Sequence, residues 1–166
     1  MKIALIVALS KNNVMGDSSG LLLWHLGDDL KNFRELTLNQ VVIMGRRTYD
    51  SIGHILAHRV NIVITSSDIT ARGLIVAKNP EEALALAYGY DKDIFIIGGK
   101  SVYENLVEFV DTLYVTRVDT ESTGNIIFNP LEKSDAWQLV EQLIVGANQQ
   151  NDHNFTTTKY HRYRQI

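Results

Sequence analysis

The sequence predicts an α/β fold. We expect a single domain over residues 1–166, with a mixed, mostly parallel central sheet flanked by helices and closed by a C-terminal antiparallel hairpin. Three observations predict this. Short apolar runs recur and scarcely alternate with polar residues, as in strands that are covered on both faces. Helical patterns fall between these runs. Two longer β-prone segments end the chain.

The apolar runs are the predicted strands. They comprise residues 3–9, 41–44, 60–64, 74–77, 94–97 and 113–118. The first run follows a basic residue but is shorter than the apolar region of a secretory signal, so a buried strand is the better interpretation. Residues 137–145 and 156–163 are β-prone and are joined by a polar, Asn-rich stretch, which predicts the closing hairpin and makes the sheet mixed.

Helical signals lie between the strands. Leu30, Phe33 and Leu36 form a stripe three residues apart that follows an acidic start. Asn79 and Pro80 have the residue types of an N-cap and a first helical position. Residues 101–109 follow a pair of glycines and predict a further short helix. With no repeat and no linker in view, one domain is expected.

The composition narrows the function classes. The chain is 45% hydrophobic and 21% charged, as globular proteins are. A net charge of −3 lacks the basic excess of a general nucleic-acid binder, so no nucleic-acid partner is expected. The absence of cysteine excludes disulfides, a thiolate zinc site and a cysteine nucleophile. The five histidines show no metal-ligand spacing, and no apolar run reaches the ~20 residues that span a bilayer, so neither a metal nor a membrane is expected.

Asp29 is the sharpest single residue. On a helix it shares the apolar face with Phe33 and Leu36, whereas Asp28 lies about 100° away. Asp29 can simply complement the positive end of the helix. Alternatively it is a buried carboxylate whose two oxygens accept from a ligand with adjacent N–H donors, and whose raised pKa allows proton transfer.

Two glycine turns point to a phosphate-bearing ligand. Gly45 ends a strand and is followed by Arg46 and Arg47, which are either solvated or available to phosphate oxygens at a helix start. Gly98-Gly99 repeats the pattern of strand, tight turn and helix, although it lacks the three-glycine dinucleotide fingerprint. At the carboxyl ends of one sheet, the two turns are able to cradle one extended ligand.

These segments, in their order and spacing, resemble dihydrofolate reductase of the bacterial chromosomal type across essentially the whole chain. The resemblance rests on Leu5-Ile6-Val7-Ala8, Trp24-x-Leu26-x-x-Asp29-Leu30, Val42-Ile43-Met44-Gly45-Arg46-x-Thr48, Ser51-Ile52-Gly53, Arg59-x-Asn61-Ile62-Val63, Ile96-Ile97-Gly98-Gly99-x-x-Val102-Tyr103 and Leu113-Tyr114-x-Thr116. It implies an NADPH-dependent oxidoreductase that reduces 7,8-dihydrofolate to 5,6,7,8-tetrahydrofolate.

The resemblance also implies residue roles. Asp29 would hold the pterin ring and assist proton addition, Thr116 would bond to its carboxylate, and Trp24 would help to order a nearby water. The substrate site would further include Ile6, Val7, Leu30, Phe33, Ile52, Ile97 and Arg59, the last pairing with the glutamate tail. The cofactor residues would be Ala8, Met15, Gly16, Gly45, Arg46, Arg47, Thr48, Thr65, Ser66, Lys78, Gly98, Gly99, Lys100, Ser101, Val102 and Tyr103. The loop over residues 15–23 would close over the nicotinamide.

The departures from the family pattern concern loops. Members usually carry proline where this chain has Leu23, Gly27, Val41, Ile55, Ala57 and Asn129. We expect Gly27→Pro to stabilise the protein, because a first-turn N–H has no partner inside its helix. A family Gly-Asp pair is here Gly124-Asn125, which removes a charge that helps to tether the mobile loop.

Two competing interpretations remain open. One is the NADPH reductase of riboflavin biosynthesis, which shares the fold; the pterin-suited run from Trp24 to Asp29 argues against it. The other is a non-catalytic nucleotide-binding paralogue. Retention of Asp29, Phe33, Arg59 and Thr116 argues against that. A cytoplasmic monomer is the expected state.

Overall fold

The structure is a computed structural model that describes residues 1–19, 23–129 and 131–163. Its main sheet has eight strands in the order β5-β4-β3-β6-β1-β7-β10-β9. The chain forms two compact units. Unit 1 comprises Met1–Leu5 and Leu36–Val110, and unit 2 comprises Ile6–Glu35 and Asp111–Ile166.

Unit 1 contains the parallel part of the sheet. The beginning of β1 (Ile3–Ser10) pairs with β6 (Ile94–Ile96), β6 with β3 (Val41–Gly45), β3 with β4 (Val60–Ile64), and β4 with β5 (Leu74–Ala77), all in parallel. The helices of this unit are α2 (Arg46–Ile52), α3 (Pro80–Tyr88), α4 (Lys100–Leu106) and the 3₁₀ turn η1 (Val107–Phe109). The side chains of β3 from Val41 to Met44 are fully buried, as the continuous apolar run predicts.

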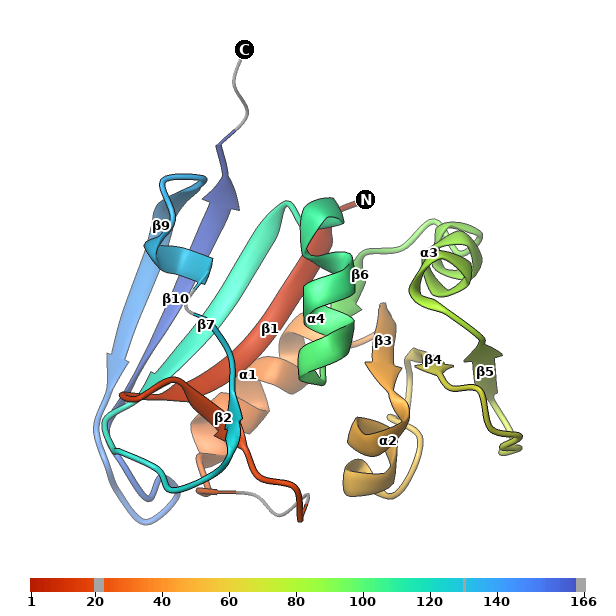
Figure 1. The fold of residues 1–166 in the computed structure, drawn as a ribbon. Helices are drawn as coiled ribbons and strands as arrows, with labels where there is room; N and C mark the ends of the chain where they lie inside the picture. The colour runs from red at the N-terminus through yellow and green to blue at the C-terminus, as the bar shows by residue number, and fades with distance from the viewer. Residues whose placement is uncertain (20–22, 130, 164–166) are drawn as a thin grey trace. The chain divides into compact units, whose positions relative to one another are not determined.

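Unit 2 contains the antiparallel part. β7 (Thr112–Val118) pairs with β10 (Phe155–Arg162), which pairs with β9 (Trp137–Val145), so these three strands lie side by side (Figure 1). Helix α1 (Gly27–Thr37) begins in this unit. The unit also holds η2 (Leu131–Lys133) and a separate two-stranded sheet of β2 (Val14–Gly16) and β8 (Ile126–Ile127). The expected mixed, mostly parallel sheet with a closing hairpin is thereby confirmed.

A local signal accounts for the start of α3. The side chain of Asn79 accepts a hydrogen bond from the Glu82 backbone N–H at 2.8 Å, and Pro80 opens α3, as expected from these residue types. The helix predicted over residues 101–109 divides into α4 and η1. Strands β2 and β8 were not predicted, because three and two residues carry too little pattern to be recognised.

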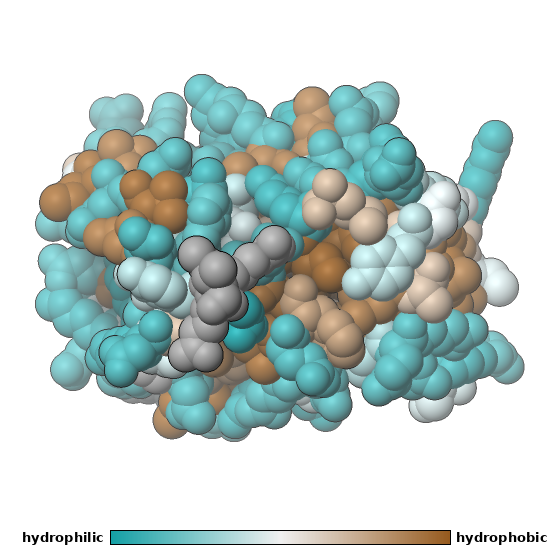
Figure 2. Space-filling view, turned by 90° about the horizontal axis from the view of Figure 1, so that it is seen from above, coloured by the Kyte–Doolittle hydropathy of each residue, from teal (hydrophilic) through white to brown (hydrophobic). Residues whose placement is uncertain are grey.

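Polar side chains cover most of the face shown in Figure 2, with hydrophobic residues between them. Strand β9, which lies at the edge of the main sheet, carries several exposed apolar side chains. Among them, Leu143 is 63% exposed and Ile144 is 75% exposed. The pairing of β9 with β10 shifts register around Val140, which is an irregularity that disfavours continuous pairing with a further strand. No helix of the described residues is long and apolar enough to cross a membrane.

Candidate active site

The centre of the candidate site in unit 2 is a carboxylate paired with a hydroxyl. Asp29 lies in the first turn of α1, and Thr116 lies on β7 with 4% of its surface exposed. The Thr116 hydroxyl donates a hydrogen bond of 2.6 Å to Oδ1 of Asp29. Burial raises the pKa of the Asp29 carboxyl, and the hydrogen bond from Thr116 opposes that rise without cancelling it. Asp29 is therefore able to hold a proton closer to neutrality than an exposed aspartate.

The apolar residues expected near Asp29 differ in exposure. Leu30 is 50% exposed and Phe33 is half-buried, so the apolar face of α1 is not fully covered by protein. Ile6 on β1 is half-buried, whereas Val7 is only 5% exposed and belongs to the core. An aspartate beside partly exposed apolar side chains suits a ligand that combines a flat apolar ring with N–H donors.

Trp24 precedes α1 and packs against a small hydrophobic cluster. The buried members of this cluster are Leu26, Val118 and Phe155, and Val145 packs against it together with Trp24. Beside the cluster, the backbone N–H of His25 donates to the Asp152 carboxylate at 2.7 Å, and the Asp152 N–H donates to the His25 carbonyl at 2.8 Å. The approach to α1 is thus held by the β9–β10 hairpin.

Gly27, the first residue of α1, contradicts the sequence-based expectation for this position. Its N–H donates a 2.8 Å hydrogen bond to the carbonyl of Gln150 in the β9–β10 connection. A Cβ atom at position 27 would lie 3.0 Å from that carbonyl oxygen. The N–H has no partner inside its helix, as expected, but it has one in the β9–β10 connection, so a proline here would remove a hydrogen bond and collide with the acceptor.

The loop that follows β2 is tethered in spite of the changed family pair. Asn125 accepts a hydrogen bond from the Ser18 N–H through Oδ1 at 3.0 Å. An amide thus supplies the acceptor that a carboxylate would offer. Of the expected nicotinamide loop, residues 20–22 lie outside the described residues, while Met15 and Gly16 belong to β2 and Leu23 is half-buried.

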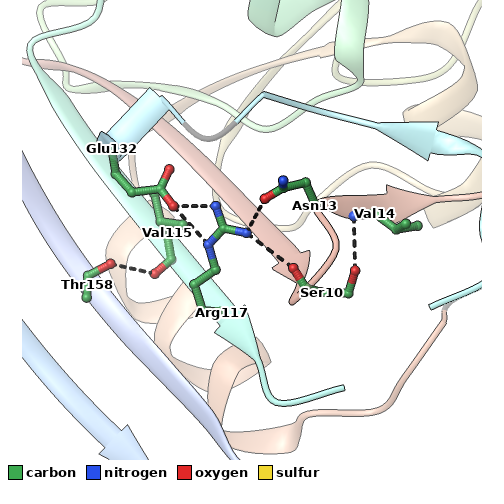
Figure 3. A network of polar contacts seen from close by, with 7 residues as sticks. All are labelled: Ser10, Asn13, Val14, Val115, Arg117, Glu132 and Thr158. Carbon is green, nitrogen blue, oxygen red and sulfur yellow. Dashed lines mark hydrogen bonds and ion pairs between the residues drawn. The ribbon is translucent and has the colours of Figure 1, made fainter. Parts of the chain in front are cut away.

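A polar network centred on Arg117 fixes the turn between β1 and β2 (Figure 3). Arg117 Nε donates to Glu132 at 2.8 Å, and a second nitrogen of the same guanidinium also contacts this carboxylate. Arg117 further donates to the Asn13 side chain at 2.7 Å and to the Ser10 carbonyl at 3.2 Å. The Glu132 side chain is 9% exposed, so the pair is largely shielded from water. Arg117 follows Thr116 on β7, so one strand serves both the network and Asp29.

In unit 1 the two glycine turns meet, as the sequence predicts. The Gly45 N–H donates a 2.8 Å hydrogen bond to the Gly98 carbonyl. Gly98 has φ +122°, which side chains rarely adopt, and a Cβ there would lie 3.2 Å from the Tyr103 hydroxyl oxygen and 3.4 Å from Thr48 Oγ1. A Cβ at Gly45 would lie 3.1 Å from Val102. A side chain at Gly98 would therefore be strained, and one at Gly45 would require the Val102 side chain to shift by a few tenths of an ångström. The glycine turns meet beside the Thr48 and Tyr103 hydroxyls, an arrangement that suits a phosphate-bearing cofactor.

The basic residues expected beside these turns are mostly at the surface. Arg46 Nε donates to both oxygens of Asp50, at 2.8 and 3.0 Å, in an ion pair along α2. Arg47 is exposed and forms no ion pair with any residue that the structure describes. Lys100 lies 3.8 Å from Glu104 in α4, and its neighbour Ser101 is exposed. A phosphate that binds Arg46 would therefore have to compete with the Asp50 carboxylate.

Thr65, Ser66 and Lys78 follow β4 and β5. The Thr65 hydroxyl accepts from the Ser67 N–H at 3.1 Å, and the residue is 8% exposed, so it also organises its own turn. Ser66 and Lys78 are exposed, and Lys78 Nζ is 3.9 Å from Asp68. These residues are accessible to a ligand at the carboxyl ends of their strands.

Hydrogen bonds to Thr37 and Ala57 help to hold Arg59 in place. Its Nε donates to Thr37 Oγ1 at 2.7 Å and its Nη1 to the Ala57 carbonyl at 2.8 Å. Thr37 is completely buried, so the guanidinium is oriented before any ligand arrives. Such a fork suits a carboxylate. Ile52 and Ile97, the remaining expected apolar residues, are half-buried.

Residues that the sequence analysis missed include Gln150, Arg117 and Thr37. Gln150 lies in a polar stretch that indicates only a connection between two strands. Arg117 had a usable signal, because a charge inside an apolar strand needs a partner. Thr37 had none. The described residues contain no group of three or more histidine, aspartate or glutamate side chains that would hold a metal ion.

Comparison with known proteins identifies the family. The family model described as dihydrofolate reductase matches residues 2–162. The chain is 36% identical to the dihydrofolate reductase of Buchnera aphidicola from Schizaphis graminum over 156 residues, covering 93% of this chain and 96% of that protein. It is 32% identical to the Bacillus subtilis enzyme over 161 residues, covering 96% and 94%. The chain belongs to the dihydrofolate reductase family.

A solved structure agrees with this assignment. The dihydrofolate reductase of Enterococcus faecalis, complexed with NADP(H) and RAB-propyl, matches with a TM-score of 0.90 and 32% identity, covering 98% of this chain and 97% of that one. The resemblance noted in the sequence is confirmed. The protein is an NADPH-dependent oxidoreductase that reduces 7,8-dihydrofolate to 5,6,7,8-tetrahydrofolate, and its small-molecule ligands are dihydrofolate and NADPH. Neither the riboflavin-type reductase nor a non-catalytic paralogue is favoured.

Proposed function

We propose that Asp29 is the residue that binds the pterin and handles the proton in this reduction, with Thr116 as its partner. The observation that carries the proposal is the 2.6 Å hydrogen bond from the Thr116 hydroxyl to a carboxylate whose pKa is raised by burial. Thr116 occupies one oxygen and fixes the plane of the carboxylate. The remaining acceptor positions of the carboxylate are suited to two adjacent N–H donors, such as those that a pterin presents.

The proton follows from the same geometry. Because the pKa of Asp29 is raised, its protonated form persists to higher pH than for an exposed aspartate. The rate of reduction should therefore be highest in acid and fall as pH rises through that pKa. Trp24, packed on the Leu26 cluster, would limit solvent on this side and help to order one water beside the carboxylate.

The other substrate contacts are proposed from the family pattern. Ile6, Leu30, Phe33, Ile52 and Ile97 would contact the apolar parts of dihydrofolate, with Val7 contributing mainly from the core. Arg59, whose guanidinium is oriented by Thr37 and Ala57, would pair with the glutamate-tail carboxylate.

The cofactor residues are proposed on the fit of the two glycine turns, since a Cβ at either turn would fill the space beside Thr48, Val102 and Tyr103. NADPH, when bound, supplies the hydride. The turns, with Arg46, Arg47 and Lys100, would hold its phosphates, and Thr65, Ser66 and Lys78 would contact the adenosine end. Ala8, Met15, Gly16 and Ser101 complete the proposed set.

We further propose that residues 1–166 act as one dihydrofolate-reductase-like domain, that the protein is a monomer, and that it works in the cytoplasm. One family match from residue 2 to residue 162 supports the single domain. The register irregularity at the edge of β9 supports the monomer, because it disfavours pairing with a second copy.

The experiment that tests the role of Asp29 is the Asp29→Asn variant, assayed by the dihydrofolate-dependent loss of NADPH absorbance. The amide keeps an acceptor for Thr116 but has no titrating proton, so turnover should fall roughly 100- to 10,000-fold at neutral pH and recover partly in acid. Glu35→Gln is the matched control, because it removes one negative charge from an exposed position of the same helix, and its activity should stay close to that of the parent. Near-full activity of Asp29→Asn at neutral pH would overturn the assignment.

A further inference from the structure

The first turn of α1 receives its cap from a distant part of the chain. Leu26 precedes the helix and has no side-chain oxygen to accept from the first N–H groups. The carbonyl of Gln150 accepts from Gly27 instead, and Oδ1 of Asn151 accepts from the Asp28 N–H at 3.1 Å. Asn151 thus does for α1 what an N-cap residue does, although it lies 123 residues further along the chain.

The Asn151 amide is used at both ends. Its Nδ2 donates to the Asp28 carboxylate at 2.8 Å while its Oδ1 accepts from the backbone of the same residue. Only 1% of Asn151 is exposed, and its backbone is fixed by mutual hydrogen bonds with Asn148 of 3.0 and 3.2 Å. A buried amide with both ends satisfied and its own backbone anchored has little freedom to move.

This contact distinguishes the two adjacent carboxylates of α1. Asp28 is bound by Asn151 from the β9–β10 hairpin, and Asp29 is bound by Thr116 from β7. Both lie in the first turn, where the helix dipole favours negative charge. By holding both the N–H and the carboxylate of Asp28, Asn151 fixes the rotation of the turn and therefore the direction in which the next side chain points.

We propose that Asn151 is a positioning residue for the reductase reaction, which acts through the first turn of α1 to set the direction and the solvent exposure of the Asp29 carboxylate. The proposal rests on the role proposed above for Asp29.

Removal of the amide has a defined physical consequence. In Asn151→Ala the Asp28 N–H and carboxylate both lose their partner, and the first turn of α1 gains freedom. Asp29 then gains solvent, and because burial is what raises its pKa, that pKa should fall. The charged groups at this joint are Asp28 on α1 and Asp152 in the hairpin, whose carboxylate is bound by the His25 N–H. Neither Asp28 nor Asp152 is substituted in Asn151→Ala, so the number of carboxylates near Asp29 stays the same.

The experiment compares the parent, Asn151→Ala and the exchange variant Asp28→Asn/Asn151→Asp. In the exchange, the new carboxylate at 151 can accept from both the backbone N–H and the new amide at 28, so the contact is restored with its polarity reversed. Three quantities are measured: the Asp29 pKa by ¹³C NMR titration of its carboxyl carbon in the ligand-free protein, the dissociation constants of dihydrofolate and NADPH, and the pH profile of hydride transfer in a single turnover.

For Asn151→Ala we expect a lower Asp29 pKa, dihydrofolate binding weaker by roughly tenfold, and a hydride-transfer profile displaced to lower pH. NADPH affinity should not change. The exchange variant should recover most of the pKa and of the dihydrofolate affinity. A fall in the unfolding midpoint of Asn151→Ala with an unchanged Asp29 pKa and dihydrofolate affinity would make Asn151 merely structural and overturn the proposal.

Two further arms keep the test decisive. If Asn151→Ala fails to fold, the single Asn151→Asp variant replaces it, because it places a second carboxylate beside Asp28. Dihydrofolate binding should weaken in Asn151→Asp and recover in the exchange variant. An exchange variant that binds dihydrofolate as weakly as Asn151→Asp overturns the proposal. If Asp29→Asn proves active, the proposed role of Asp29 fails. The NMR titration still reports whether Asn151 positions that carboxyl, so the two failures are distinguishable.

Discussion

Gly27→Pro should destabilise the protein, although family members usually have proline at this position. In this chain the Gly27 N–H donates a 2.8 Å hydrogen bond to the Gln150 carbonyl. Proline has no N–H, and its ring carbon Cδ would occupy the space between the nitrogen and that oxygen. The hairpin tip, meaning Gln150 and Asn151 in the β9–β10 connection, would have to move away. Asn151 would then also lose its hydrogen bond from the Asp28 N–H.

The magnitude follows from three contributions. The lost hydrogen bond contributes about 0.5–1.5 kcal/mol to destabilisation. Forcing ring atoms against a packed backbone adds about 1–3 kcal/mol. Against these, the reduced freedom of the unfolded chain returns about 0.4–1 kcal/mol. The net loss is about 2 kcal/mol, which for a domain of this size lowers the melting temperature by about 4–8 °C.

The assay is urea or thermal unfolding without ligands, because bound cofactor would mask the difference by mass action. Gly27→Ala is the matched control: it keeps the N–H, and the gain in helix propensity of about 1 kcal/mol offsets a Cβ placed 3.0 Å from the Gln150 oxygen. Its stability should lie near that of the parent. A Gly27→Pro variant as stable as the parent, or more so, would show that the hairpin tip does not hold α1.

Three further predictions concern charge. Asp29→Asn should raise the stability of the folded protein near pH 7. A carboxyl whose pKa is raised by folding makes the folded protein less stable as pH rises through that pKa, and the amide avoids this cost. The gain should vanish on acidification toward pH ~4, as measured by urea unfolding at both pH values. Arg46→Ala should weaken NADPH binding roughly 10- to 150-fold and leave NADH binding nearly unchanged in titrations; equal weakening of both would place Arg46 away from the 2′-phosphate. Arg117→Met should lower the unfolding free energy by about 3 kcal/mol, since it leaves the Glu132 carboxylate buried without its cation, and adding Glu132→Leu should recover a large part; full parental stability of Arg117→Met alone would refute the reasoning.

The sequence predicts the parallel strands well because they are short, continuous apolar runs. The run at 41–44 is buried on every side chain, and burial is what a continuous apolar pattern reports. Strands β2 and β8 escaped, because their pairing is set by a tertiary approach and not by their own five residues. Asn79 and Pro80 located the start of α3 since capping acts over three or four residues.

The candidate site divides in the same way. The spacing of Asp29, Phe33 and Leu36 places the carboxylate on the apolar face. The residues alone left open whether Asp29 only complements the helix end or takes part in chemistry, and the family resemblance favoured the second interpretation. The glycine turns were recognisable because each is local. The hydrogen bonds of Gly27 and Asn151 were not, because they join residues more than a hundred positions apart through a backbone carbonyl and an amide, and neither group leaves a periodic trace. Hence the sign expected for Gly27→Pro from the sequence is the opposite of the sign expected from the structure.

The long-range cap of α1 also has a consequence for the order in which the chain can fold. Every residue of unit 1 has been synthesised once Val110 leaves the ribosome. Unit 2 cannot close then, because Asp28 emerges early and Asn151 follows 123 residues later. Contacts so distant in sequence form slowly. The first turn of α1, which carries Asp29, therefore remains uncapped until the β9–β10 hairpin has been synthesised and has folded. A nascent chain held before that hairpin would contain every residue of unit 1, together with an α1 whose first turn still lacks its cap.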